Sequence, residues 1–158
     1  MRRIYDILEE PRGDDYRMLL ELCARHCASF LLVIREENWL DATAHGILKD
    51  LRQFELKKEL VSEWPGTKLL ADKASVYHYR LTTQSLQVLE RSADGLYEWQ
   101  QPKRPEDLCF FDKDGDEILV TIAHEDDAFL KLSPSEKEDM CSRIPNLKLK
   151  EKVNSQKS

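Results

Sequence analysis

Residues 95–129 read GLYEWQQPKRPEDLCFFDKDGDEILVTIAHEDDAF, and this stretch decides how we expect the chain to fold. Asp114 and Gly115 stand between two apolar runs, which is the pattern of a β-hairpin with Gly115 at positive φ. The second run, residues 118–123, carries apolar or small side chains on both faces. It therefore predicts a central strand, covered on both sides.

The acidic residues of this hairpin, 112–116, also resemble the first half of an EF-hand calcium loop. Such a loop requires Gly at position 6 and Glu at position 12. Glu117 and Ala123 occupy these two positions here, and no flanking pair of helices is predicted. The pattern favours a turn over a calcium site.

The rest of the chain alternates between helical and strand-like hydrophobic spacing. Helical spacing marks residues 16–27 and 40–51. Thr82 or Thr83 caps a short third helix that carries Leu86 and Leu89 and ends before Gly95, and Ser133-Pro134-Ser135-Glu136 is a capping box that begins a fourth helix. Strand-like runs cover residues 30–34, 54–64 and 74–81, with an optional one at 4–8. We expect an α+β (mixed α/β) fold, with one mixed sheet of four to six strands and about four helices packed on it.

The length of 158 residues suits one domain, which we place at residues 1–145. Residues 146–158 read NLKLKEKVNSQKS and contain few apolar side chains. A segment of this composition buries too little surface to order itself, so we predict a Lys-rich flexible tail.

Charge and hydropathy exclude several functions. The net charge is −6, and residues 1–145 alone carry −9 because the last 13 residues hold four Lys and one Glu. A domain with this negative charge is repelled by the phosphate backbone of nucleic acids, which argues against nucleic-acid binding. No apolar run approaches the roughly 20 residues that span a bilayer, and the first residues lack the pattern of a signal peptide. We expect a cytoplasmic protein without membrane contact, either a monomer or a weak dimer.

The four cysteines, Cys23, Cys27, Cys109 and Cys141, are dispersed, and in a reducing compartment we expect free thiols. Cys23, His26 and Cys27 resemble part of a metal site, but a structural zinc site needs four ligands. Cysteines at apolar helix positions are commonly core residues. We therefore predict no metal and no cofactor.

His124, Glu125 and Asp126 are the candidate catalytic residues, because they follow the predicted central strand. A histidine beside carboxylates can act as a general acid or base. The alternative is a polar loop, which we favour because neighbouring strand residues point to opposite faces and no nucleophile is identifiable. The chain also lacks the glycine-rich phosphate-binding motifs and the GxSxG nucleophile motif.

Tyr97, Trp99, Trp64 and Arg12 are the candidate binding residues. Trp and Tyr are enriched in binding hot spots, although bulky aromatic side chains also fill cores. Trp99 lies in an irregular stretch that contains prolines, so we expect it to be the more exposed of the two tryptophans.

Four segments resemble a known family: YDILEEPRGDDY (residues 5–16), EWPGT (63–67), LYEWQ (96–100) and PEDLC (105–109). They are similar to landmarks of a small bacterial family of uncharacterised soluble proteins, some of which carry a stage III sporulation label. That label implies a membrane-anchored ring protein, whereas this chain shows no membrane segment, so we do not carry that function over. The resemblance implies no activity and no site.

Together these observations favour a non-catalytic, protein-binding regulatory module with an acidic surface. Acidic proteins of the inhibitor or immunity type have this profile, and such a surface attracts a basic protein partner. The alternative is a small enzyme that uses His124 with neighbouring carboxylates.

Overall fold

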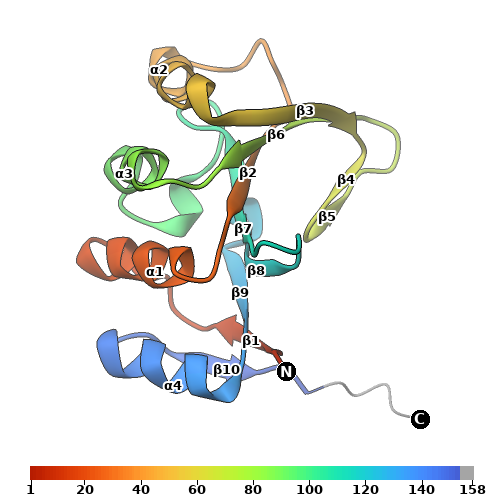
Figure 1. The fold of residues 1–158 in the computed structure, drawn as a ribbon. Helices are drawn as coiled ribbons and strands as arrows, with labels where there is room; N and C mark the ends of the chain where they lie inside the picture. Colours follow the sequence, from red (N-terminus) through yellow and green to blue (C-terminus); the bar gives the residue numbers. More distant parts are fainter. Residues whose placement is uncertain (154–158) are drawn as a thin grey trace.

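One sheet of eight strands organises the molecule, with the order β10-β1-β9-β8-β7-β2-β6-β3 (Figure 1). The computed structural model describes residues 1–153. Every neighbouring pair of strands in this sheet is antiparallel. The strands are β1 (Arg3–Ile7), β2 (Ser29–Ile34), β3 (Glu55–Val61), β6 (Ala74–Arg80), β7 (Glu106–Phe111), β8 (Glu117–Ile122), β9 (Asp127–Leu132) and β10 (Leu149–Glu151).

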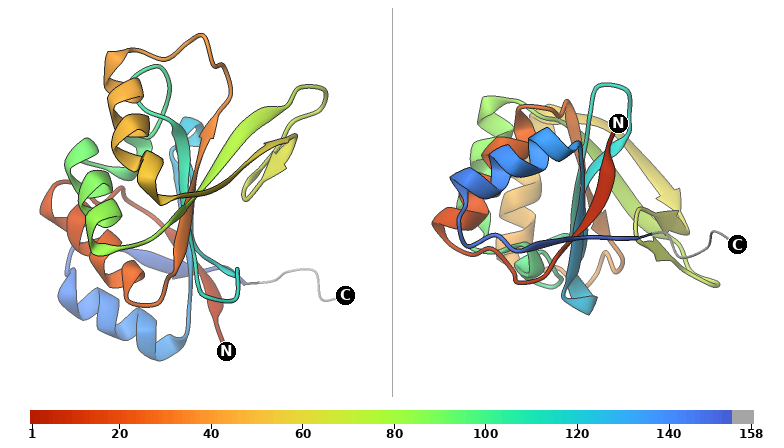
Figure 2. Two further views of the ribbon diagram at one scale, coloured as in Figure 1. Left: turned by 45° about the horizontal axis from the view of Figure 1, so that its top comes forward. Right: turned by 90° about the horizontal axis from the view of Figure 1, so that it is seen from below.

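Four α-helices cover one face of the sheet, and a short hairpin covers part of the other (Figure 2). The helices are α1 (Asp14–Ala24), α2 (Ala42–Leu51), α3 (Thr83–Ser92) and α4 (Pro134–Arg143). Short 3-10 turns are η1 (Arg52–Phe54), η2 (Leu96–Glu98) and η3 (Ala123–Glu125). The hairpin consists of β4 (Glu63–Trp64) and β5 (Thr67–Lys68). The α+β prediction with four helices is confirmed.

The prediction of a mixed sheet with four to six strands is wrong in both details, because the sheet is antiparallel and has eight strands. Residues 127–132 alternate between buried and more exposed positions, which is the pattern of a strand with one face on the core. The acidic residues Glu125, Asp126 and Asp127, at and directly before its start, made this segment look like a polar loop. The optional strand at residues 4–8 is present as β1.

Two hydrophobic layers explain the long apolar run of β2. Phe30 and Leu32 lie in the core under the helices, and Leu31 and Val33 lie in a second cluster under the β4–β5 hairpin. The hairpin lies close to the sheet because Gly66 has a φ of +85° and a Cβ there would meet Ile122 Cγ1 at 2.6 Å. Strand β8, predicted as central, lies inside the sheet between β9 and β7.

The segment expected to be a tail differs from that expectation in its first residues. Leu147 is 6% exposed and belongs to the core under the helices. Strand β10 pairs with β1, which supplies hydrogen bonds to an edge that would otherwise be open. Residues 154–158 of the expected tail lie outside the described part of the chain.

Candidate functional site

The ends of three adjacent strands, β2, β7 and β8, bring a charged cluster together. These strands are antiparallel neighbours, so the end of β2 and the end of β8 both lie beside the beginning of β7. Arg35 follows β2, Glu106 and Asp107 begin β7, and His124 follows β8. The topology therefore gathers residues that are up to 89 positions apart in the sequence.

An irregularity in strand β7 brings the side chains of both Glu106 and Asp107 to the charged cluster. Neighbouring strand residues normally point to opposite faces of a sheet. Here the register between β2 and β7 shifts between Leu31 and Val33, and Asp107 has a φ of +57°. Bulges of this kind redirect side chains, and they are enriched next to functional sites.

Asp107 is fully buried and its carboxylate is held by two donors. Its Oδ2 accepts from Trp64 Nε1 at 3.0 Å, and its Oδ1 accepts from the Ala123 backbone N–H at 3.0 Å. Arg35 Nη2 lies 3.9 Å from the same Oδ2. The side chain is therefore fixed in position before any ligand binds.

Arg35 is the cation of this cluster. Its Nε lies 3.2 Å from Glu106 Oε1, and its guanidinium lies 5.2 Å from the centre of the Trp64 ring. Charged groups brought out of water stabilise a fold less well than apolar side chains of similar size. A charged cluster at this depth therefore points to a role in function more than in stability.

Glu106 and His124 face a pocket of about 570 Å³. The pocket is lined by Arg35, Glu36, Trp39, Leu69, Asp72, Lys73, Gln100, Gln101, Glu106 and His124. Burial raises the pKa of Glu106, although the nearby Arg35 opposes the shift. Glu106 is thus a carboxyl group that resists ionisation more than an exposed glutamic acid does, and it lies near the side chain of His124.

Gln101, only 7% exposed, fixes the loop at the mouth of this pocket. Its Oε1 accepts from the backbone N–H groups of Arg35 and Glu36, at 2.7 and 3.1 Å. Its Nε2 donates to the carbonyl oxygens of Glu36 and Trp39, at 2.7 and 3.0 Å. Residues 35–39 are thereby ordered, although they lie in no helix or strand.

Trp39 stands on this ordered loop with 56% of its surface exposed. Its neighbours Glu36 and Glu37 are exposed as well, and Asp72 lines the same pocket. We call the group formed by Glu36, Glu37, Trp39 and Asp72 the acidic rim.

Of the three predicted catalytic residues, only one lines the pocket. His124 lines the pocket, whereas Glu125 and Asp126 are exposed and do not line it. Glu125 Oε2 lies 3.5 Å from His124 Nε2, and Asp126 adopts the left-handed conformation that ends the 3-10 turn η3. The carboxyl groups of Glu106 and Asp107 also lie near His124, each with an oxygen within 4.8 Å of a ring nitrogen of His124.

The expectation that Trp99 is the more exposed tryptophan is wrong. Trp99 is fully buried, and its Nε1 donates to the Tyr16 hydroxyl at 3.0 Å, which in turn donates to the Leu89 carbonyl at 2.8 Å. Trp64 is 4% exposed, and its Nε1 donates to Asp107 Oδ2, so its indole holds that carboxylate in position. Neither indole is available as a binding surface.

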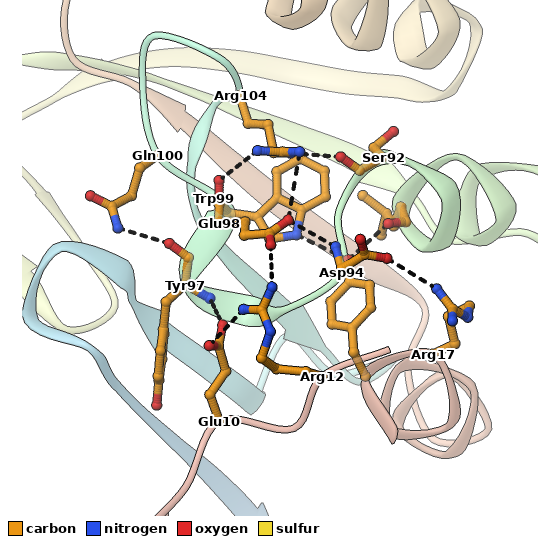
Figure 3. Close-up of polar contacts among 12 residues, drawn as sticks. Glu10, Arg12, Arg17, Ser92, Asp94, Tyr97, Glu98, Trp99, Gln100 and Arg104 are labelled. Carbon is orange, nitrogen blue, oxygen red and sulfur yellow. Dashed lines mark hydrogen bonds and ion pairs between the residues drawn. The ribbon is translucent and has the colours of Figure 1, made fainter. Parts of the chain in front are cut away.

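Arg12 and Tyr97 belong to an ionic network that fixes the segment around η2 (Figure 3). Arg12 bridges Glu10 and Glu98, and the Tyr97 N–H donates to Glu10 Oε2 at 2.7 Å. Burial opposes ionisation of Glu98, but the hydrogen bonds from the Asp94 N–H and Arg12 lower its pKa overall. These contacts anchor a loop, and they account for Arg12 without a ligand.

Sequence reasoning missed Arg35, Trp39, Gln101, Glu106 and Asp107. Trp39 left a usable signal, because a tryptophan next to the polar residues 36–38 fits no apolar period. The bulge at Asp107 left none, since it depends on the pairing of β7 with β2.

Comparisons of the chain with protein-family models, curated proteins and solved structures found no match. The resemblance to the bacterial family stays a prediction. Among residues 1–153, none of the helices has the length and apolar character needed to cross a bilayer.

Proposed function

We propose that the protein is a non-catalytic binding module that recognises a basic segment of another protein through the acidic rim. The observation that carries the proposal is Trp39, an exposed tryptophan on a loop held by four hydrogen bonds from one buried glutamine. Tryptophan is enriched among residues that dominate binding energy. A loop that is ordered beforehand loses little entropy on binding.

Charge defines the kind of partner. Glu36 and Asp72 line the same pocket as Trp39, Glu37 is the next residue after Glu36, and the body of the protein is acidic. Carboxylates attract Lys and Arg side chains and speed their encounter, and an indole face also attracts a cation. A partner with a basic surface segment satisfies both features, as an inhibitor-type or immunity-type function requires.

The test begins with capture of the partner from an extract of the source cells, followed by binding measurements with the purified partner. We expect a basic protein to be retained at one copy per chain and to be released by salt. Trp39→Ala should weaken binding by more than about tenfold, the range expected for a hot spot. Leu8→Ala is the matched control because Leu8 is also 56% exposed but follows β1.

Fluorescence gives a direct reading of the same surface. Of the three tryptophans, Trp39 is the exposed one, so quenching by caesium ions reports on it. Partner binding should protect Trp39 from the quencher. Equal affinity of the wild type and Trp39→Ala, or full quenching in the complex, would contradict the proposal.

A second candidate is a small enzyme, and the observation that favours it is that Glu106 and His124 line one pocket. This version replaces Glu125 and Asp126 by Glu106 as the carboxyl partner of His124. An activity lost in Glu106→Gln and His124→Ala, but kept in Trp39→Ala, would favour the enzyme. Loss of partner binding in Trp39→Ala alone would favour the binding module.

A further inference from the structure

We propose that Glu106, Asp107 and His124 form a binding site for one divalent transition-metal ion at the floor of the pocket. One potential ligand atom from each residue lies within 4.8 Å of the others. Ligand atoms around a zinc ion, at bond lengths of about 2.1 Å, are about 3.4 Å apart. Small side-chain rotations, chiefly of the more exposed His124, close that difference.

The donor set selects the class of metal. One imidazole nitrogen and two carboxylate oxygens suit Zn²⁺, Mn²⁺, Fe²⁺ or Co²⁺ better than Mg²⁺ or Ca²⁺, which prefer oxygen alone. Three protein ligands leave a coordination position for water or a bound group, as in catalytic zinc sites. The pocket of about 570 Å³ gives access to that position.

Neighbouring groups already orient the two carboxylates. Trp64 Nε1 and the Ala123 N–H hold Asp107, and the Gln101 N–H donates to Glu106 Oε2 at 3.3 Å. Each carboxylate oxygen has a second lone pair that these donors leave free. Support of this kind around metal ligands is what raises metal affinity in known sites.

Arg35 offsets part of the negative charge but not all of it. One guanidinium stands against two carboxyl groups, so ionisation of both leaves one negative charge uncompensated in the cluster. Lys73 lines the pocket but is exposed to water, where its charge is screened. A divalent ion would supply the missing positive charge at the place where His124 adds a third ligand.

The experiment is a titration of the full chain, freed of metal with a chelator, with Co²⁺ followed by Zn²⁺. We expect one Co²⁺ per chain by calorimetry, a visible spectrum typical of coordinated Co²⁺, and displacement by Zn²⁺. His124→Ala and Glu106→Gln should each weaken binding by more than about tenfold. Because His124 is exposed, His124→Ala should stay folded, and an unchanged circular dichroism spectrum verifies this.

Two controls separate this site from other donors. Glu125→Gln removes an exposed carboxylate beside His124 and should bind Co²⁺ as the wild type does. His26→Ala removes a donor near Cys23 and Cys27 and should also leave binding unchanged. Binding that survives in His124→Ala, or that depends on His26, would overturn the proposal. Trp39→Ala should keep its metal, so this result is independent of the partner-binding test.

Discussion

Glu90 on α3 faces Glu21 on α1, and this pair makes stability depend on pH. Burial, and after it the neighbouring Glu21, raises the pKa of Glu90 from 4.5 to about 7, although Arg17 opposes the shift. The folded state therefore binds more protons than the unfolded state between these values, and stability falls as pH rises through this window. Above pH 7 the cost of two facing carboxylates is fully present.

Replacement of Glu90 by Gln removes that cost. At about pH 8 we expect Glu90→Gln to raise the free energy of unfolding by about 1 kcal/mol, a modest value because Glu90 is only partly buried and water screens the pair. At about pH 4 the variant and the wild type should agree. Urea denaturation at both pH values measures this, with the exposed Glu138→Gln as control. Lower stability of Glu90→Gln at pH 8 would contradict the prediction.

Residue identity alone predicted exposure poorly. Trp99 lies in an irregular segment with prolines and is fully buried, while Trp39 follows a polar run and is exposed. The exposure of a tryptophan depends on whether other segments of the chain pack over its side chain, and this tertiary packing is not visible in the local sequence. His124 could be predicted as a site residue because it ends a strand, but Glu106 and Asp107 could not, because only the bulge directs both to His124.

Two glycines of different elements should respond oppositely to alanine. Gly46 is exposed within α2 and a Cβ there meets nothing within 4 Å, so Gly46→Ala should stabilise by about 0.5–1 kcal/mol through helix propensity. Gly115 also has open space around it, but its φ is +86° in the β7–β8 turn. Gly115→Ala should destabilise by about 1 kcal/mol through backbone strain. Changes of the same sign in thermal unfolding would contradict this account.

Elements with local signals were predicted well. The capping box at Ser133 and Glu136 is present, and so is the β7–β8 hairpin, because each depends on residues a few positions apart. Strand β3 lies within the predicted strand-like run of residues 54–64. Leu56 and Leu60 of this edge strand are nevertheless 55% and 65% exposed, which its hydrophobic spacing did not indicate.

The order of the strands could not be predicted from hydrophobic patterns, since those patterns show which face of a strand is buried and not which strand lies beside it. The two chain ends illustrate this limit. Strand β1 lies between β9 and β10, so the first residues pair with the last strand of the sheet. Residues 147–151 look like part of a polar tail until the open edge of β1 is known.

Leu147 tests whether this closing strand contributes to the stability of the whole molecule. Its side chain is 6% exposed and packs in the core under the helices, two residues before β10 begins. Leu147→Ala should lower the free energy of unfolding by about 2–3 kcal/mol, the lower part of the range for buried leucines. Leu70→Ala is the control, because Leu70 is fully exposed and should change stability by less than about 0.5 kcal/mol. Equal stability of the two variants in urea would mean that β10 adds nothing to the fold, since its anchor in the core could then be removed without loss.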